Sequence, residues 1–299
     1  MPPRPRDDGL SEVVGFVLLL GVIVIALSLY QVYGVPAVGR ENEIAHMNQV
    51  KDRFVDYKLA LDSLWVNNRN GVLLSTAFDL GTGAPATAGT VFALPILTPA
   101  GSGGTVSVNE GGAELTIEAG DEKPVPIPLG SLSYRSSNNY WVDQTWTYQM
   151  GAVFLSQEGG TTVRVGPSIA AYNTSTGNTT LTLAPISLDG SAMIAGSGPV
   201  RVETRMRWGN QSTLDGVYEN VTLTIEADDP VTAGAWQRAF SEVGQRARDE
   251  DVNISEWKIG RYENTSWLYV KPQGSKYVIL SMYPANYTVT IHNAASLAE

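Results

Sequence analysis

The chain has 299 residues, a formal net charge of −10 and no cysteine. This length can bury a sizeable core, and the lack of cysteine excludes disulfides, thiolate metal sites and cysteine nucleophiles. The acidic balance argues against nucleic acid as a partner. His46 and His292 are the only histidines, so we expect no histidine-rich metal site, and no motif indicates a cofactor.

The most apolar part of the chain lies near its N-terminus. Residues 13–39 contain no charged side chain, and their centre consists largely of Leu, Val and Ile. As a helix this run of 27 residues is about 40 Å long, enough to cross a hydrocarbon core of about 30 Å. Tyr30 and Tyr33 suit the membrane interface at its far end, and Pro36 predicts a kink or short break. We therefore expect one membrane helix.

A polar leader precedes this run and ends in Asp8-Gly9, followed by Leu10. Secretory signal peptides instead have a small-residue cleavage site after the apolar stretch, and none follows here. The arrangement resembles the archaeal class III signal peptide, which prepilin peptidases cut before the apolar helix. The resemblance implies a leader of residues 1–9, cleavage between Gly9 and Leu10, and a mature protein that keeps residues 10–39. This segment is also similar to the N-terminal helix of archaeal type IV pilins and pilin-like surface proteins.

Glu12 is a carboxylate at the edge of the apolar run, where burying an unpaired charge is expensive. In bacterial type IV pilins a Glu near the mature N-terminus pairs with a neighbour's α-amino group during assembly, and the resemblance implies such a role here. Cleavage after Gly9 would make Glu12 the third mature residue, whereas that family has it fifth. The alternative is a carboxylate in the headgroup region. Arg4 and Arg6 precede the helix and favour an N-terminus inside the cell.

A second helix is predicted over residues 40–66. Its apolar residues are spaced alternately three and four apart: Met47, Val50, Phe54, Tyr57, Leu61 and Leu64. This spacing is typical of a packed helix seam. Two partners for the seam are open, namely the chain's own β-rich domain and neighbouring subunits around a filament axis. His46, next to the seam, is expected to be a polar helix residue and neither a ligand nor a base.

The rest of the chain is rich in Thr, Val, Gly and Ser and shows short alternating runs. The clearest lie at 105–108, 114–117, 200–208, 221–225 and 287–291. Short strands between Gly-rich turns predict an antiparallel β-sandwich or barrel-like domain, so that the whole chain is of the α+β class.

One additional helix is predicted within this β-rich part. Asp229 suits its N-cap, Pro230 its first turn, and Trp236, Phe240 and Val243 its apolar face. A boundary near 226–230 would separate an extracellular β-rich domain of residues 67–226 from residues 227–299, unless the two form one domain.

Seven Asn residues lie in the glycosylation pattern Asn-x-Ser/Thr: Asn173, Asn178, Asn210, Asn220, Asn253, Asn264 and Asn286. None of the first eight Asn of the chain fits the pattern, whereas seven of the last eight do. Because acceptors must lie outside the cytoplasm, this distribution favours an extracellular, glycosylated domain.

An aromatic cluster lies at residues 134–148 and contains Tyr140, Trp141 and Trp146. If exposed, these three are a candidate surface for binding carbohydrate or for adhesion, whereas if buried they are part of the sheet core. The stretch of residues 129–144 is similar to an uncharacterised family of archaeal pilin-like membrane proteins, for which no activity is known.

No phosphate loop, dinucleotide fingerprint, zinc motif or nucleophile elbow is present, so we expect no enzyme. The sequence predicts a pilin-like structural protein of the cell surface, with a single membrane span and a large extracellular domain. Its apolar helix would lie in membrane lipid, or in a filament with copies of itself or other pilin-like subunits. The alternative is an anchored module for binding or adhesion that does not polymerise.

Overall fold

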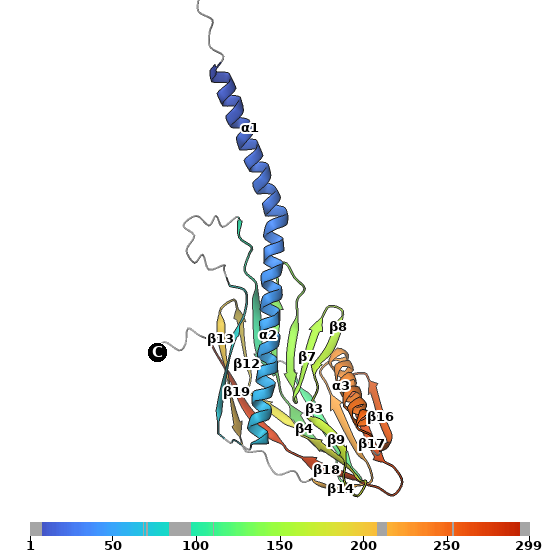
Figure 1. The fold of residues 1–299 in the computed structure, drawn as a ribbon. Coiled ribbons are helices and arrows are strands. Elements are labelled where there is room, and N and C mark those ends of the chain that lie inside the picture. Colours follow the sequence, from blue (N-terminus) through green and yellow to red (C-terminus); the bar gives the residue numbers. More distant parts are fainter. Residues whose placement is uncertain are drawn as a thin grey trace, which may run out of the picture.

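The computed structural model describes residues 8–67, 69, 71–83, 97–109, 111–207, 214–252 and 254–293. In these residues one long N-terminal helix leads into a β-rich domain that carries one further helix (Figure 1). The predicted α+β class, with its long N-terminal helix and mainly antiparallel sheets, is therefore confirmed.

The N-terminal helix is continuous from end to end. It consists of α1 (Asp8–Leu29), a short π-helical turn η1 (Tyr30–Gly34) and α2 (Val35–Val66). Pro36 has no N–H group, and the helix adjusts in the preceding turn, where the N–H of Val35 donates to the carbonyl of Tyr30 five residues back. The predicted irregularity at Pro36 is therefore a π-turn at which the helix changes direction, without a break (Figure 1).

The described strands form four sheets, called A to D here. Sheet A joins, in spatial order, β1 (Leu73–Asp79), β13 (Pro199–Arg207), β19 (Ala285–Asn293) and β11 (Ile186–Asp189). Sheet B joins β12 (Ala192–Gly196), β2 (Gly103–Val108), β5 (Ser131–Ser137), β6 (Thr145–Gln149), β7 (Ala152–Gln157) and β8 (Gly160–Val165). Sheet C joins β16 (Ile254–Tyr262), β17 (Thr265–Pro272), β15 (Val221–Glu226), β3 (Ala113–Ala119) and β4 (Val125–Leu129). Sheet D joins β14 (Gly216–Tyr218), β18 (Val278–Met282), β10 (Thr179–Leu183) and β9 (Ile169–Asn173).

The five predicted strands lie in β2, β3, β13, β15 and β19, except that Trp208 is outside the described residues. Their alternating sequence has a direct structural counterpart, because side chains on β3, β13 and β15 alternate between buried and more exposed positions. Among the strand pairs of the described chain, β10–β18 and β11–β19 are parallel, which the sequence did not predict.

The first hydrophobic core is built on the seam of α2. Met47, Val50, Phe54, Tyr57 and Leu61 are at most 3% exposed and pack on side chains of sheets A and B. Of the two partners left open for this seam, the chain's own β-rich domain is therefore the one that covers it.

The second core is built around α3 (Pro230–Asp249), the predicted additional helix. Asp229 caps it by accepting hydrogen bonds from the N–H groups of Val231 and Thr232 at 2.7 and 3.0 Å. Its apolar face, which includes Trp236 and Phe240, is buried against sheets B, C and D.

The two cores belong to one interleaved unit. Strand β15 pairs with β17 across the expected boundary near 226–230, and β19 pairs with both β13 and β11. The described part of residues 227–299 thus completes sheets A, C and D, and the boundary near 226–230 is not a domain boundary.

Candidate functional site

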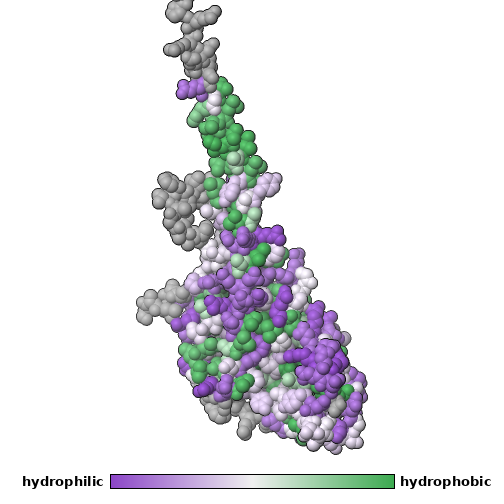
Figure 2. All heavy atoms as spheres, viewed as in Figure 1, coloured by the Kyte–Doolittle hydropathy of each residue, from purple (hydrophilic) through white to green (hydrophobic). Residues whose placement is uncertain are grey.

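The part of the N-terminal helix that precedes α2 projects from the β-rich domain with its apolar side chains exposed (Figure 2). Val13, Leu18, Val22 and Tyr33, for example, are 61%, 66%, 67% and 71% exposed. The helix is long and apolar enough to cross a membrane. An apolar surface of this size needs a cover, which lipid or other protein subunits can provide.

The residues predicted to take part in processing and assembly lie at the start of this helix. Gly9 and Leu10 are within α1, which begins at Asp8, and Glu12 follows about one turn further along with an exposed side chain. Residues 1–7 of the predicted leader lie outside the described residues.

Where the helix meets the β-rich domain, three loop segments lie beside it, namely residues 80–83, 97–102 and 138–144, called the collar here. The strongest contact is made by Glu43 of α2, which is 1% exposed. Its two carboxylate oxygens accept hydrogen bonds from the backbone N–H groups of Asn139 and Tyr140, at 2.7 and 2.8 Å. A charged acceptor for two backbone donors fixes the β5–β6 loop to the helix.

Tyr140 and Trp141, from the same loop, pack against the preceding turn of the helix. A Cβ atom at Gly39 would overlap the ring of Tyr140, so glycine is what lets the ring lie against the helix backbone. The Tyr140 hydroxyl accepts a hydrogen bond from the N–H of Ala100 at 3.0 Å, which ties two collar segments together. The guanidinium of Arg40 lies 4.4 Å from the ring centroid of Trp141, a cation–π contact.

The candidate binding surface of Tyr140, Trp141 and Trp146 therefore does not exist as an exposed patch. Trp146 is 3% exposed and stacks on Phe54 in the first core, with ring centroids 6.5 Å apart. Tyr140 and Trp141 are half-buried. For Trp146 the buried alternative holds, because strand alternation directs it inward with Tyr134 and Tyr148.

Sequence reasoning missed Glu43, although one signal was available. Glu43 lies four residues before Met47 and so continues the spacing of the seam toward α1. A buried carboxylate needs hydrogen-bond or charge partners, so an acid at a seam position predicts a specific polar contact at that place.

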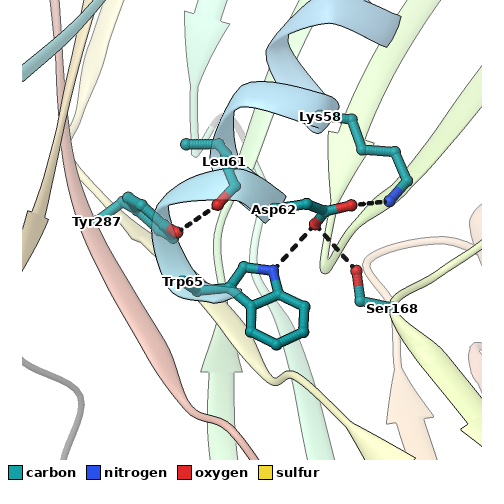
Figure 3. Close-up of polar contacts among 6 residues, drawn as sticks. All are labelled: Lys58, Leu61, Asp62, Trp65, Ser168 and Tyr287. Carbon is teal, nitrogen blue, oxygen red and sulfur yellow. Dashed lines mark hydrogen bonds and ion pairs between the residues drawn. The ribbon is translucent and has the colours of Figure 1, made fainter. Parts of the chain in front are cut away.

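Near its other end α2 carries an ion pair between two of its own residues, which Figure 3 shows together with its neighbours. The Nζ of Lys58 lies 2.5 Å from Oδ2 of Asp62, and both side chains are largely shielded from solvent, at 10% and 24% exposed. Oδ1 of Asp62 also accepts hydrogen bonds from Nε1 of Trp65 at 3.0 Å and from the hydroxyl of Ser168 at 3.2 Å. Ser168 precedes β9, so this network joins α2 to the β-rich domain.

Two buried tyrosines reinforce the same end of α2. The Tyr57 hydroxyl is 2.9 Å from the hydroxyl of Thr204. The Tyr287 hydroxyl donates to the carbonyl of Leu61 at 2.9 Å, a hydrogen bond that Figure 3 shows. Burial raises the pKa of both phenols above its usual range, and the Asp62 carboxylate raises that of Tyr287 further. Both hydroxyls therefore stay protonated, and α2 is fixed to the domain at both ends.

Five of the seven glycosylation candidates are described, and none of them is buried. Asn173 and Asn286 are exposed, whereas Asn178, Asn220 and Asn264 are half-buried at turns or at the start of a strand. Asn210 and Asn253 lie outside the described residues. The five described sites lie on strands or turns of sheets A, C and D.

A groove of about 1000 Å³ opens between sheets A and C. Pro126 and Pro128 from the edge strand β4 line one side, and Leu188 from the edge strand β11 and Tyr287 line the other. The groove is mainly apolar, with Arg207 and Asp189 among its polar residues. Among the described residues, no group of three or more His, Asp or Glu is placed to hold a metal ion.

These features define a class of protein in which one N-terminal apolar helix, long enough for a membrane span, is fixed to a β-rich domain with two cores. A family model described as a family of unknown function (DUF7289) matches residues 101–261, more than half of the chain, and the chain belongs to this family. The match begins just before β2, ends in β16 and includes the β5–β6 loop of the collar. The comparisons with curated proteins and with solved structures gave no match.

Proposed function

We propose that this protein is a pilin-like structural protein of the cell surface, anchored in the membrane by α1 and η1. One observation carries the proposal: an exposed apolar helix continues unbroken into α2, which is fixed to the β-rich domain at both ends by hydrogen bonds of Glu43, Leu61 and Asp62. The N-terminus would lie inside the cell and the domain outside.

Lipid is the cover that the geometry favours for the exposed helix. The seam of α2 is fully used by its own domain, and the outer face of α2 carries charged residues that include Glu41, Asp52 and Arg53. The large apolar surface that copies of the protein could share is therefore that of α1 and η1. Filament assembly through that surface alone is the second form of the proposal, since burial of apolar area contributes about 25 cal/mol per Å².

The N-terminus of the protein isolated from membranes tests the proposed processing. Mass spectrometry should find a mature chain that begins at Leu10 and remains in the membrane after alkaline extraction. A chain that keeps Met1, or one that begins after the apolar run, contradicts prepilin processing. Recovery in sheared surface filaments, and not in the membrane, would replace the anchored form with the filament form.

The proposed orientation is tested by glycosylation. Peptides that contain Asn264 should show a mass increase that disappears in Asn264→Gln. Asn293→Gln is the matched control, because Asn293 lies on the same domain but outside the acceptor pattern. Unmodified peptides at all seven candidate sites would remove the support that this pattern gives to an extracellular domain.

The groove between sheets A and C supports the second candidate function, an anchored module for binding or adhesion. Its apolar lining with a few polar groups is typical of ligand sites. A glycan and peptide array probed with the full-length protein should then show binding that Ser187→Trp abolishes by filling the groove. If binding is unaffected by this substitution, the groove is not the binding site.

A further inference from the structure

We infer that the tip of the β5–β6 loop, Trp141 and Val142, together with Arg40, forms a surface that contacts the phosphate layer of the lipid bilayer. This inference rests on the proposed membrane anchor and names a second contact between the domain and the membrane. The domain would then be seated on the lipid surface and not only tethered to it.

The depth of the collar follows from helix geometry. Tyr30 and Tyr33 mark the membrane interface, because amphipathic aromatic rings lie at headgroup level. Arg40 follows Tyr33 by seven residues, a rise of about 10 Å along the helix, and each headgroup layer is about 5–8 Å thick. Helical side chains lean toward the N-terminus, which here is the direction of the bilayer. The long side chain of Arg40 can therefore bring its guanidinium to the level of the lipid phosphates.

The β5–β6 loop is held at this same depth. The Trp141 ring lies under the Arg40 guanidinium, Tyr140 packs on Gly39, and Glu43 binds the loop backbone. At the tip, Val142 is 45% exposed although it is apolar. An exposed apolar tip next to an indole and an arginine has the composition of an interfacial membrane contact.

The charge around the tip indicates which lipid group is recognised. Arg40 is exposed and can bind a phosphate oxygen through its guanidinium. Asp143 is the nearest acid in the loop, and its carboxylate accepts a hydrogen bond from the N–H of Asn138 at 2.7 Å, inside the loop. A second protein copy is a less suitable partner, because the tip adjoins the apolar helix that lipid is proposed to cover.

The lack of cysteine makes a direct test possible, since any single substitution to cysteine gives a unique labelling site. The full-length protein would be reconstituted into vesicles of phosphatidylcholine and phosphatidylglycerol, with a nitroxide or an environment-sensitive fluorophore at one position. Val142→Cys reports on the loop tip and Val22→Cys on the membrane helix. Val217→Cys, on β14 at the end of the domain opposite α1, is the matched exposed control (Figure 1).

The inference predicts a graded result. The label at residue 22 should be quenched by lipids that carry a quencher deep in the acyl chains, and the label at 142 by lipids quenched near the headgroup, several-fold more than the label at 217. If the label at residue 22 is in lipid while the label at residue 142 behaves like the one at residue 217, the loop contact is refuted and the proposed anchor stands. If 142 is shielded from both water and lipid quenchers, a protein contact replaces the lipid contact. If 22 is not in lipid, the proposed anchor itself fails.

Discussion

Glu43 gives the sharpest test of how the helix is joined to the domain. Glu43→Ala removes the carboxylate that accepts hydrogen bonds from Asn139 and Tyr140, whose N–H groups then lack this acceptor. Asn139 is exposed and Tyr140 half-buried, so water can reach both donors, and the loss of two hydrogen bonds at about 0.5–1.5 kcal/mol each should lower the free energy of unfolding by about 1–3 kcal/mol. Glu43→Gln keeps one acceptor oxygen and should cost about half as much, because its amide nitrogen cannot accept the second hydrogen bond.

The measurement is chemical unfolding of the full-length protein in detergent, followed by tryptophan fluorescence. Glu41→Ala is the matched control, since Glu41 lies two residues earlier on the same helix with an exposed side chain. It should change stability by less than about 0.5 kcal/mol, the usual range for surface substitutions. Limited proteolysis should in addition cut residues 138–144 in Glu43→Ala more rapidly than in the parent chain. If Glu43→Ala and Glu41→Ala are equally stable, the collar does not hold the helix as described.

Three further predictions concern the same chain. Gly39→Ala should destabilise the protein by about 1–3 kcal/mol, because the new Cβ atom overlaps the Tyr140 ring. The double variant Gly39→Ala/Tyr140→Ala should recover part of this loss. Gly15→Ala is the control in thermal unfolding and should have little effect, since Gly15 has open space around it. Asp62→Asn leaves the largely buried Lys58 without its counter-ion and should lower the free energy of unfolding by about 3–5 kcal/mol. Asp52→Asn, in the exposed Lys51–Asp52 pair, is the control and should cost less than about 1 kcal/mol. Equal costs for the two variants in urea unfolding would contradict the ion-pair argument. Burial alone would raise the pKa of Asp229, but hydrogen bonds from the Thr232 hydroxyl and from the N–H groups of Thr232 and Val231 outweigh it and lower the pKa. The cap therefore stabilises α3 above the ordinary pKa of an aspartate, and this stabilisation is lost as pH falls through the lowered value; Asp229→Asn should make stability less dependent on acid pH, and an unchanged pH profile would refute the assignment.

Local signals in the sequence were sufficient to predict the helices. The spacing from Met47 to Leu61 matches the buried face of α2, because a helix can bury only residues that share one side. The additional helix was equally predictable, since Asp229, Pro230 and the Trp236–Phe240 spacing indicate its cap, first turn and apolar face. Strand alternation at 200–207 likewise matches the buried side of β13.

Long-range pairing could not be predicted in the same way. Glu43 and Asn139 are 96 residues apart in the sequence, and nothing local to either residue shows that the two meet. The parallel pairing of β11 with β19 also depends on which strand lies beside which, whereas alternation reports only which face of a strand is buried. Trp146 was left with two alternatives for the same reason, because an aromatic residue in a strand suits a core or a surface equally well until its sheet partners are known.

The contacts at the two ends of α2 together determine how the domain can move relative to the proposed anchor. Glu43 at the collar and Asp62, which accepts a hydrogen bond from Ser168, lie 19 residues apart, about 28 Å along the helix, so the domain cannot swing about α2 without breaking one of these two polar contacts. The π-turn η1 lies outside both attachment points, and it is where the helix changes direction. If α1 spans a membrane as proposed, the angle between the domain and the membrane is set at η1, and a lipid contact at Trp141 and Val142 would fix that angle. In a filament built through α1 alone, contacts between neighbouring domains would set this angle instead. The apolar composition of α1 suits both the anchored and the filament form, so the depth of Val142 in the bilayer distinguishes the two forms more directly.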